Sequence, residues 1–239
     1  MSDASFLKAL SESFQRYLIF GARSPEKLKP LHSFISKTIA DKLSAGTGNN
    51  NNYEIYSLGF GNGNEKTICG RYFDKRVDIA VLSNGEPKVA TGIKFVMSNY
   101  KQNSNNYFEN MLGETANIRS NKIAYFQICI LIEQIPYYDS RDKITHFEEI
   151  TERNLKKYIV LSSDNSDIFL HSPTKTLLYI VKLPDADKEL TDSKDYSQYY
   201  KNAHLVLSNS FNQNSFKSGI ILNDFEMFVD KMIYYIRSI

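Results

Sequence analysis

The chain has 239 residues, 42% of them hydrophobic, which is enough to bury one core in a single domain of generous size. Its 29 Lys and Arg residues against 27 Asp and Glu give a net charge of +2, which argues against a protein that coats nucleic acid without specificity and still allows a local basic cleft. No apolar run reaches the roughly 18 residues of a membrane span, and the start lacks a signal-peptide pattern, so we expect a cytoplasmic protein with no membrane contact.

The first part of the chain predicts two helices and then strands. Helical periodicity runs through residues 6–18. Ser24-Pro25-Glu26 supplies an N-cap, a first-turn proline and an early acid for a second helix that extends to about Leu43. We assign residues 1–45 to a helical N-terminal part of one domain that spans residues 1–239. Strands are expected at residues 53–58 and 67–73.

A hairpin is the most informative stretch. Two apolar, β-rich runs at residues 76–82 and 88–96 are joined by Ser83-Asn84-Gly85, a hairpin-type turn. Each run carries one charged residue, Asp78 and Lys94, and strand alternation allows both on one face. Since an unpaired buried charge is costly, the two residues either face water at a strand end or are partners in a site that needs an acid and a base close together.

The segment that follows, residues 97–106, is dense in amides and is expected to be a loop. Amide side chains bind adenine edges and phosphate oxygens, so a DNA contact and an ordinary polar loop that caps a helix stay equally open. The candidate DNA-binding residues, with one arginine from the end of the next helix, are Asn99, Lys101, Gln102, Asn103, Asn105, Asn106 and Arg119.

A helix and a central strand come next. Residues 105–119 carry an apolar stripe at helical spacing, and Glu109 and Glu114 flank its opposite edges. Residues 123–132 are the most apolar run of the chain, typical of a central strand covered on both faces. These elements predict an α/β fold with a mixed β-sheet core flanked by helices.

Residues 137–239 form a C-terminal elaboration of this core. The patterns there predict, in order, a polar turn at 137–143, a helix at 147–157, strands at 158–161 and 176–181, an exposed connection at 184–200, a short strand at 203–207 and a final helix that opens with the capping pattern of residues 223–226.

Cysteine and histidine give no metal-binding pattern. Cys69 and Cys129 lie in apolar contexts and are expected to be buried free thiols. The four histidines are scattered, so we expect surface or capping residues and no zinc site; they are His32, His146, His171 and His204.

The hairpin resembles a known family. Asp78, a hairpin turn and then Ile93-Lys94 on the next strand look like the core of the PD-(D/E)XK nucleases, the fold of many type II restriction endonucleases, over about residues 53–132. Asp78 and Lys94 match the first acid and the lysine of that motif, whereas Val77 stands where a proline is frequent and Gly92 where the second acid is expected.

A subgroup of these nucleases carries the second acid on the helix after the lysine strand. Glu109 and Glu114 are the two acids that match this arrangement, and only one of them should turn towards Asp78. Glu109 is our choice because it is nearest the helix start and therefore nearest the strand end, and Glu114 is the fallback.

The resemblance implies a restriction-endonuclease-like fold and Mg²⁺-dependent hydrolysis of phosphodiester bonds at a specific site in double-stranded DNA. Mg²⁺ would be bound by Asp78, Glu109 and the Ile93 carbonyl, while Lys94 would position the attacking water and stabilise phosphate charge. Cleavage of a symmetric site would imply a homodimer. The alternatives are a catalytically inactive DNA-binding or interaction protein on the same fold, in which Gly92 marks loss of the metal site, and a repair or phage-defence nuclease.

Overall fold

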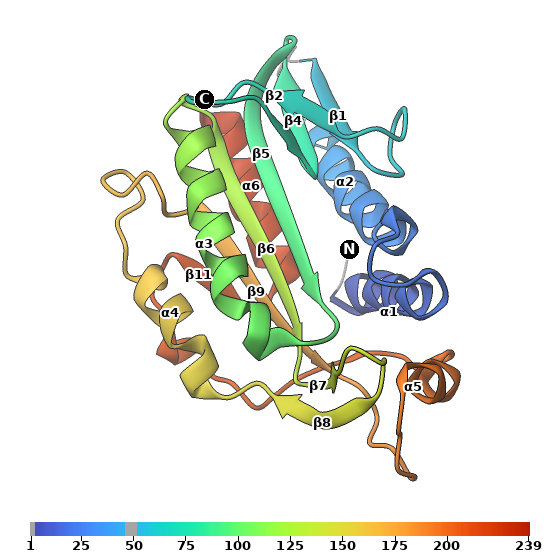
Figure 1. The fold of residues 1–239 in the computed structure, drawn as a ribbon. Helices are drawn as coiled ribbons and strands as arrows, with labels where there is room; N and C mark the ends of the chain where they lie inside the picture. Colours follow the sequence, from blue (N-terminus) through green and yellow to red (C-terminus); the bar gives the residue numbers. More distant parts are fainter. Residues whose placement is uncertain (1–2, 46–51) are drawn as a thin grey trace.

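The centre of the fold is a mixed β-sheet of seven strands with helices on both faces (Figure 1). The computed structural model describes residues 3–45 and 52–239. The strand order is β1-β4-β5-β6-β9-β10, and β11 also pairs with β9. The protein therefore has the predicted α/β fold. The strands of this sheet are β1 (Tyr53–Ser57), β4 (Ile79–Ser83), β5 (Glu86–Val96), β6 (Ala124–Ile132), β9 (Lys175–Lys182), β10 (Val206–Leu207) and β11 (Ile220–Leu222).

The antiparallel half of the sheet contains the predicted hairpin. β4 pairs with β5 across a turn in which Asn84 and Gly85 have φ angles of 52° and 82°. These left-handed conformations suit Asn and Gly, so the hairpin prediction is confirmed. The preceding residues leave the sheet, because β3 (Lys75–Val77) pairs instead with β2 (Lys66–Ile68). The strand predicted at residues 67–73 is accordingly shorter.

The parallel half contains the central strand. β5, β6 and β9 run parallel, and α3 (Tyr100–Arg119) makes the crossover from β5 to β6. Every residue of β6 is buried. The apolar run at residues 123–132 is therefore the strand covered on both faces that its composition predicts.

Three helices from the two ends of the chain cover one face of the sheet. They are α1 (Asp3–Phe20), α2 (Lys29–Ser44) and α6 (Phe225–Ser238), and α3 lies on the opposite face, in front of the sheet in Figure 1. The rings of Phe6 on α1 and Phe225 on α6 stack with centroids 4.0 Å apart. Asp224 caps α6 by accepting from the Met227 N–H at 2.8 Å, as the capping pattern predicted.

The helix predicted at residues 147–157 is present from residue 152 onwards, but the strand predicted at residues 158–161 is wrong. β8 (Ile144–Glu149) is a strand, and the helix, α4 (Glu152–Ser162), begins later and includes the residues predicted as a strand. A capping box between Thr151 and Asn154 starts the helix. Within it Tyr158 and Leu161 are buried whereas Val160 is 62% exposed, which is helical and not strand periodicity.

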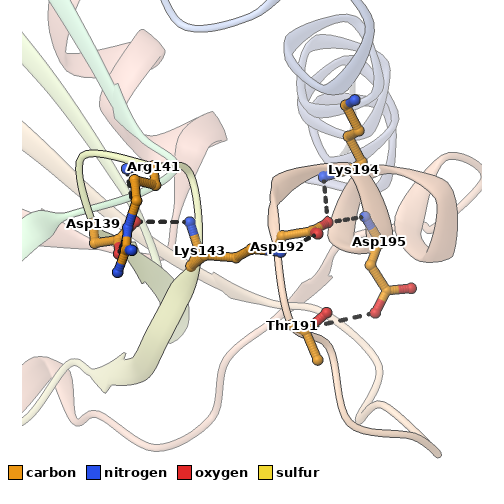
Figure 2. A network of polar contacts seen from close by, with 7 residues as sticks. All are labelled: Asp139, Arg141, Lys143, Thr191, Asp192, Lys194 and Asp195. Carbon is orange, nitrogen blue, oxygen red and sulfur yellow. Dashed lines mark hydrogen bonds and ion pairs between the residues drawn. The ribbon is translucent and has the colours of Figure 1, made fainter.

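The predicted turn at 137–143 and the predicted exposed connection at 184–200 agree with the structure only in part. β7 (Gln134–Tyr138) pairs with β8, and α5 (Ser193–Tyr200) buries Tyr196 and Tyr200. Figure 2 shows how the two segments meet: Lys143 donates to Asp192 at 2.9 Å, and Asp192 caps the start of α5. Residues 184–189 are exposed as expected, but the aromatic side chains of α5 fold back on the core, so the second part of this connection is not exposed.

Two further sequence expectations can be compared with the structure. Cys129 is buried and free, but Cys69 is exposed, so the expectation of a buried thiol there is wrong. In the part of the chain that the structure describes, no helix combines the length and the apolar character that crossing a bilayer requires.

Candidate active site

The candidate site is built where Asp78 joins β3 to β4. The backbone N–H of Ile93 on β5 donates to Asp78 Oδ2 at 2.6 Å, which holds the carboxylate against that strand. A strand residue directs its N–H and its C=O to the same edge, so the Ile93 carbonyl is directed to the Asp78 side as well. Two oxygen atoms that could bind a cation are thereby brought together at the start of β4.

Lys94 lies on the face of β5 that α3 covers. Its ammonium nitrogen is 3.8 Å from the centroid of the Tyr107 ring on α3, a cation–π contact that restricts the position of the charge. Burial lowers the pKa of Lys94, and the Asp78 carboxylate opposes this shift. Asp78 and Lys94 thus interact electrostatically on the same side of the sheet.

Of the two acids on α3, Glu114 is the one directed towards Asp78. Glu114 accepts a hydrogen bond from the Tyr125 hydroxyl at 3.1 Å and pairs with Lys75 Nζ at 3.0 Å. Glu109 is exposed, and its charge acts on Lys157 of α4 instead. Five residues correspond to about 140° around a helix, so the two carboxylates leave opposite edges of α3. The structure brings the fallback acid to Asp78 and does not bring Glu109 there.

The space beside Gly92 is filled by Tyr125. A Cβ atom on Gly92 would overlap the Tyr125 hydroxyl and would lie 3.0 Å from Gln127 Oε1. That hydroxyl is the donor to Glu114. Glycine at position 92 therefore leaves room for the tyrosine that holds the carboxylate of α3.

The electrostatics of the site are dominated by the Asp78 carboxyl. Its burial and then the nearby Glu114 charge raise its pKa to about 6, against the hydrogen bond from Ile93 and the charges of Lys75 and Lys94. The two lysines therefore do not fully offset the buried negative charge. Carboxyl groups with such a shift are enriched at functional sites.

Two residues that the sequence analysis missed, His32 and Glu65, approach Asp78 as well. His32 on α2 is 0% exposed, so the expectation of a surface or capping residue is wrong, and its burial lowers its pKa to about 4. Glu65 pairs with Arg76, with Nε and Oε2 3.0 Å apart. One ring nitrogen of His32 and one carboxylate oxygen each of Glu65 and Asp78 lie within 4.8 Å of one another. No spacing in the sequence signals this convergence, because three segments far apart in the chain contribute to it.

Two of the predicted DNA-binding amides have structural roles. The helix α3 begins at Tyr100, so most of the predicted loop is helical. Asn99 precedes it with a φ of 48°, accepts from the Tyr138 N–H at 3.1 Å and donates to the Tyr138 carbonyl at 3.1 Å. Asn103 donates to the Asn99 carbonyl at 3.1 Å. These two amides fix the start of α3 against β7.

The other predicted DNA-binding residues divide between a basic groove and the body of the protein. Lys101 and Asn105 line a groove between α3 and α4, and the exposed side chains of Gln102 and Asn106 belong to the same end of α3. Arg119 instead donates to the carbonyls of a neighbouring loop, at 2.6 Å to Ser166, 3.2 Å to Phe169 and 2.7 Å to Ser172. The remaining basic residues of the groove are Arg153, Lys156 and Lys157.

Asp78, Glu114 and Lys94 together present two carboxylates and one ammonium beside α3. Carboxylate and carbonyl oxygens are the ligands of hard divalent cations, and an ammonium group stabilises an anionic substrate. Comparisons of the chain with family models, with curated proteins and with solved structures found no match.

Proposed function

We propose that the protein is a metal-dependent nuclease that hydrolyses phosphodiester bonds in double-stranded DNA. The observation that carries this proposal is the convergence of Asp78, Glu114 and Lys94 on one face of the sheet, from the start of β4, from α3 and from β5. The hydrogen bond from Ile93, the tyrosine that holds Glu114 and the ring beneath Lys94 fix the positions of these groups. Such pre-positioning is what a phosphate-hydrolysing site needs.

Each residue of the site has a role in this proposal. Asp78, Glu114 and the Ile93 carbonyl would hold Mg²⁺, since all three offer the hard oxygen donors that this ion prefers. The bound ion would supply Lewis acidity at the phosphate and lower the pKa of its water. Lys94 would orient the attacking water and stabilise the charge that develops on the phosphate. Burial lowers its pKa, which also makes proton exchange with that water easier.

The surface beside α3 supports a nucleic-acid substrate. The groove between α3 and α4 carries Lys101, Arg153, Lys156 and Lys157, and its lining has no acidic residue among those described. Basic side chains along a groove bind the phosphate backbone in a salt-dependent manner. We further propose cleavage at a specific symmetric site by a homodimer in the cytoplasm, in line with the resemblance to type II restriction endonucleases.

A DNA-binding protein without catalytic activity is the second candidate. The Lys75–Glu114 ion pair favours it, because Lys75 already provides a counter-charge for the second acid at 3.0 Å. In that case Lys94 and the groove would serve binding alone. Mg²⁺-dependent cleavage separates the two candidates.

The test is cleavage of unmodified plasmid and phage DNA by the purified protein, with Mg²⁺ and with EDTA, analysed on gels. We expect discrete fragments with Mg²⁺ only. Lys94→Ala should lower the rate by about 10²-fold or more, whereas the control Lys88→Ala, on the same strand but near the hairpin turn, should cleave normally. Intact DNA under all metal and salt conditions with a folded protein would favour the second candidate.

A further inference from the structure

The histidine of α2 is the side chain near Asp78 that the proposed nuclease chemistry does not use. His32 is fully buried, and neither of its ring nitrogens has a hydrogen-bond partner within residues 3–45 and 52–239. A buried polar group without a partner costs about 1–3 kcal/mol, so partners are normally present. The unpaired imidazole is therefore an indication of a ligand.

The groups that His32 faces are two carboxylates. One ring nitrogen, one oxygen of Glu65 and one oxygen of Asp78 all lie within 4.8 Å of one another, and among the described residues this is the only such group of three. A first-row divalent ion holds such ligands about 2.0–2.2 Å away, which puts pairs of ligand atoms about 3–4 Å apart. Small side-chain rotations would bring the three atoms within that range.

We propose that His32, Glu65 and Asp78 form a site for a divalent first-row transition ion such as Mn²⁺. An imidazole nitrogen favours transition metals, whereas Mg²⁺ prefers oxygen ligands throughout, and two carboxylates match a dipositive ion in charge. The site lies on the α2 side of Asp78 and is separate from Glu114 on α3. This site shares Asp78 with the proposed nuclease site, and the inference rests on the proposed function only through that shared residue.

The existing partner of Glu65 does not prevent metal binding. Arg76 pairs with Glu65 at 3.0 Å, but the Arg76 side chain is 73% exposed, and ion pairs of that kind contribute little to stability. Without a cation, two carboxylates lie close together next to an imidazole without a hydrogen-bond partner among the described residues. A divalent ion would relieve this repulsion and give the ring nitrogen a partner.

Mn²⁺ binding to protein freed of metal by EDTA and dialysis, without DNA, tests the site. Electron paramagnetic resonance counts the bound ions, and electron spin echo modulation detects a nitrogen bound directly to Mn²⁺. We expect bound Mn²⁺ with nitrogen modulation. The modulation should disappear in His32→Gln, and the affinity of that site should fall by about tenfold or more in Glu65→Gln. Glu86→Gln, an exposed control on the hairpin, and Glu114→Gln should keep the modulation.

The outcomes separate this inference from the nuclease proposal. Bound Mn²⁺ without nitrogen modulation, or no binding at millimolar Mn²⁺, overturns the inference, and the plasmid assay then tests the nuclease independently. Nitrogen modulation in a protein that never cleaves DNA supports the metal site and contradicts the proposed function. If His32→Gln does not fold, Glu65→Gln decides, because Glu65 is only partly buried; unchanged Mn²⁺ affinity in that variant overturns the inference.

Discussion

Replacing the Asp78 carboxylate by an amide should stabilise the metal-free protein while it removes activity. The Asp78→Asn variant keeps the size of the side chain and an oxygen that can accept the Ile93 N–H. It removes a negative charge that is largely buried and lies near the Glu114 and Glu65 charges. Residues kept for function at the expense of stability show this behaviour.

The magnitude follows from the pKa of Asp78, which burial raises from 3.8 to about 6. Between these values the folded protein binds more protons than the unfolded chain, so its stability falls as the pH rises from 3.8 to 6, and the full penalty applies above pH 6. At about 1.4 kcal/mol per unit the penalty is at most about 3 kcal/mol. Because Asp78 keeps some exposure, we expect the free energy of unfolding of Asp78→Asn to exceed that of the wild type by about 1–3 kcal/mol. For a chain of this size, that corresponds to an increase of about 3–10 °C in Tm.

Thermal unfolding followed by circular dichroism in EDTA measures this gain. We expect Asp78→Asn to have the higher Tm at pH 7.5, and the difference from the wild type to shrink towards zero near pH 4. Asp74→Asn, an exposed neighbour, is the control and should change the Tm by about 1–2 °C at most. A Tm for Asp78→Asn equal to or below that of the wild type at pH 7.5 would refute the reasoning.

Three further predictions concern the framework of the site and can be measured by urea unfolding. Gly92→Ala should destabilise the protein by about 1–3 kcal/mol, because the new Cβ would overlap the Tyr125 hydroxyl. The same substitution should cost less stability in a Tyr125→Phe background. If the destabilisations of the two single variants simply add up in the double variant, this overlap is contradicted. Arg119→Ala should lower the free energy of unfolding by about 1–3 kcal/mol and speed proteolysis within residues 166–172, because three carbonyls there lose their hydrogen-bond donor. An unchanged proteolysis pattern would show that Arg119 does not hold this loop. Asn99→Gly should be less destabilising than Asn99→Ala, because glycine tolerates the φ of 48° and both variants lose the same side-chain hydrogen bonds; equal destabilisation by the two variants, or the reverse order, would contradict this reasoning.

The sequence predicts the centre of the fold well because local patterns determine it. Asn84 and Gly85 adopt the left-handed turn that their chemistry favours, and the apolar run at residues 123–132 becomes the buried central strand. Alternation along β5 also predicts which face Lys94 takes. Farther along the chain, the strand prediction for residues 158–161 is wrong, because these four residues alone are too few to show helical periodicity. The helix becomes recognisable only when its start at the Thr151 cap is included.

The choice between Glu109 and Glu114 shows where sequence reasoning meets its limit. Proximity along the chain favours Glu109, but the angle around α3 and the Tyr125 hydroxyl from β6 direct Glu114 to Asp78. The approach of His32 is even less accessible to sequence reasoning, because it depends on how α2 packs near the residue that precedes β4. Such long-range packing leaves no local pattern in the sequence.

The most direct test of the proposed nuclease site is a comparison of two acids on one helix. Single-turnover cleavage of plasmid DNA with Mg²⁺ should slow by about 10²-fold or more in Glu114→Gln, whereas Glu109→Gln should stay within about threefold of the wild type. Matching Tm values for the two variants would exclude a folding defect as the cause. Loss of cleavage in Glu109→Gln with normal cleavage in Glu114→Gln would contradict the site that we propose around Asp78.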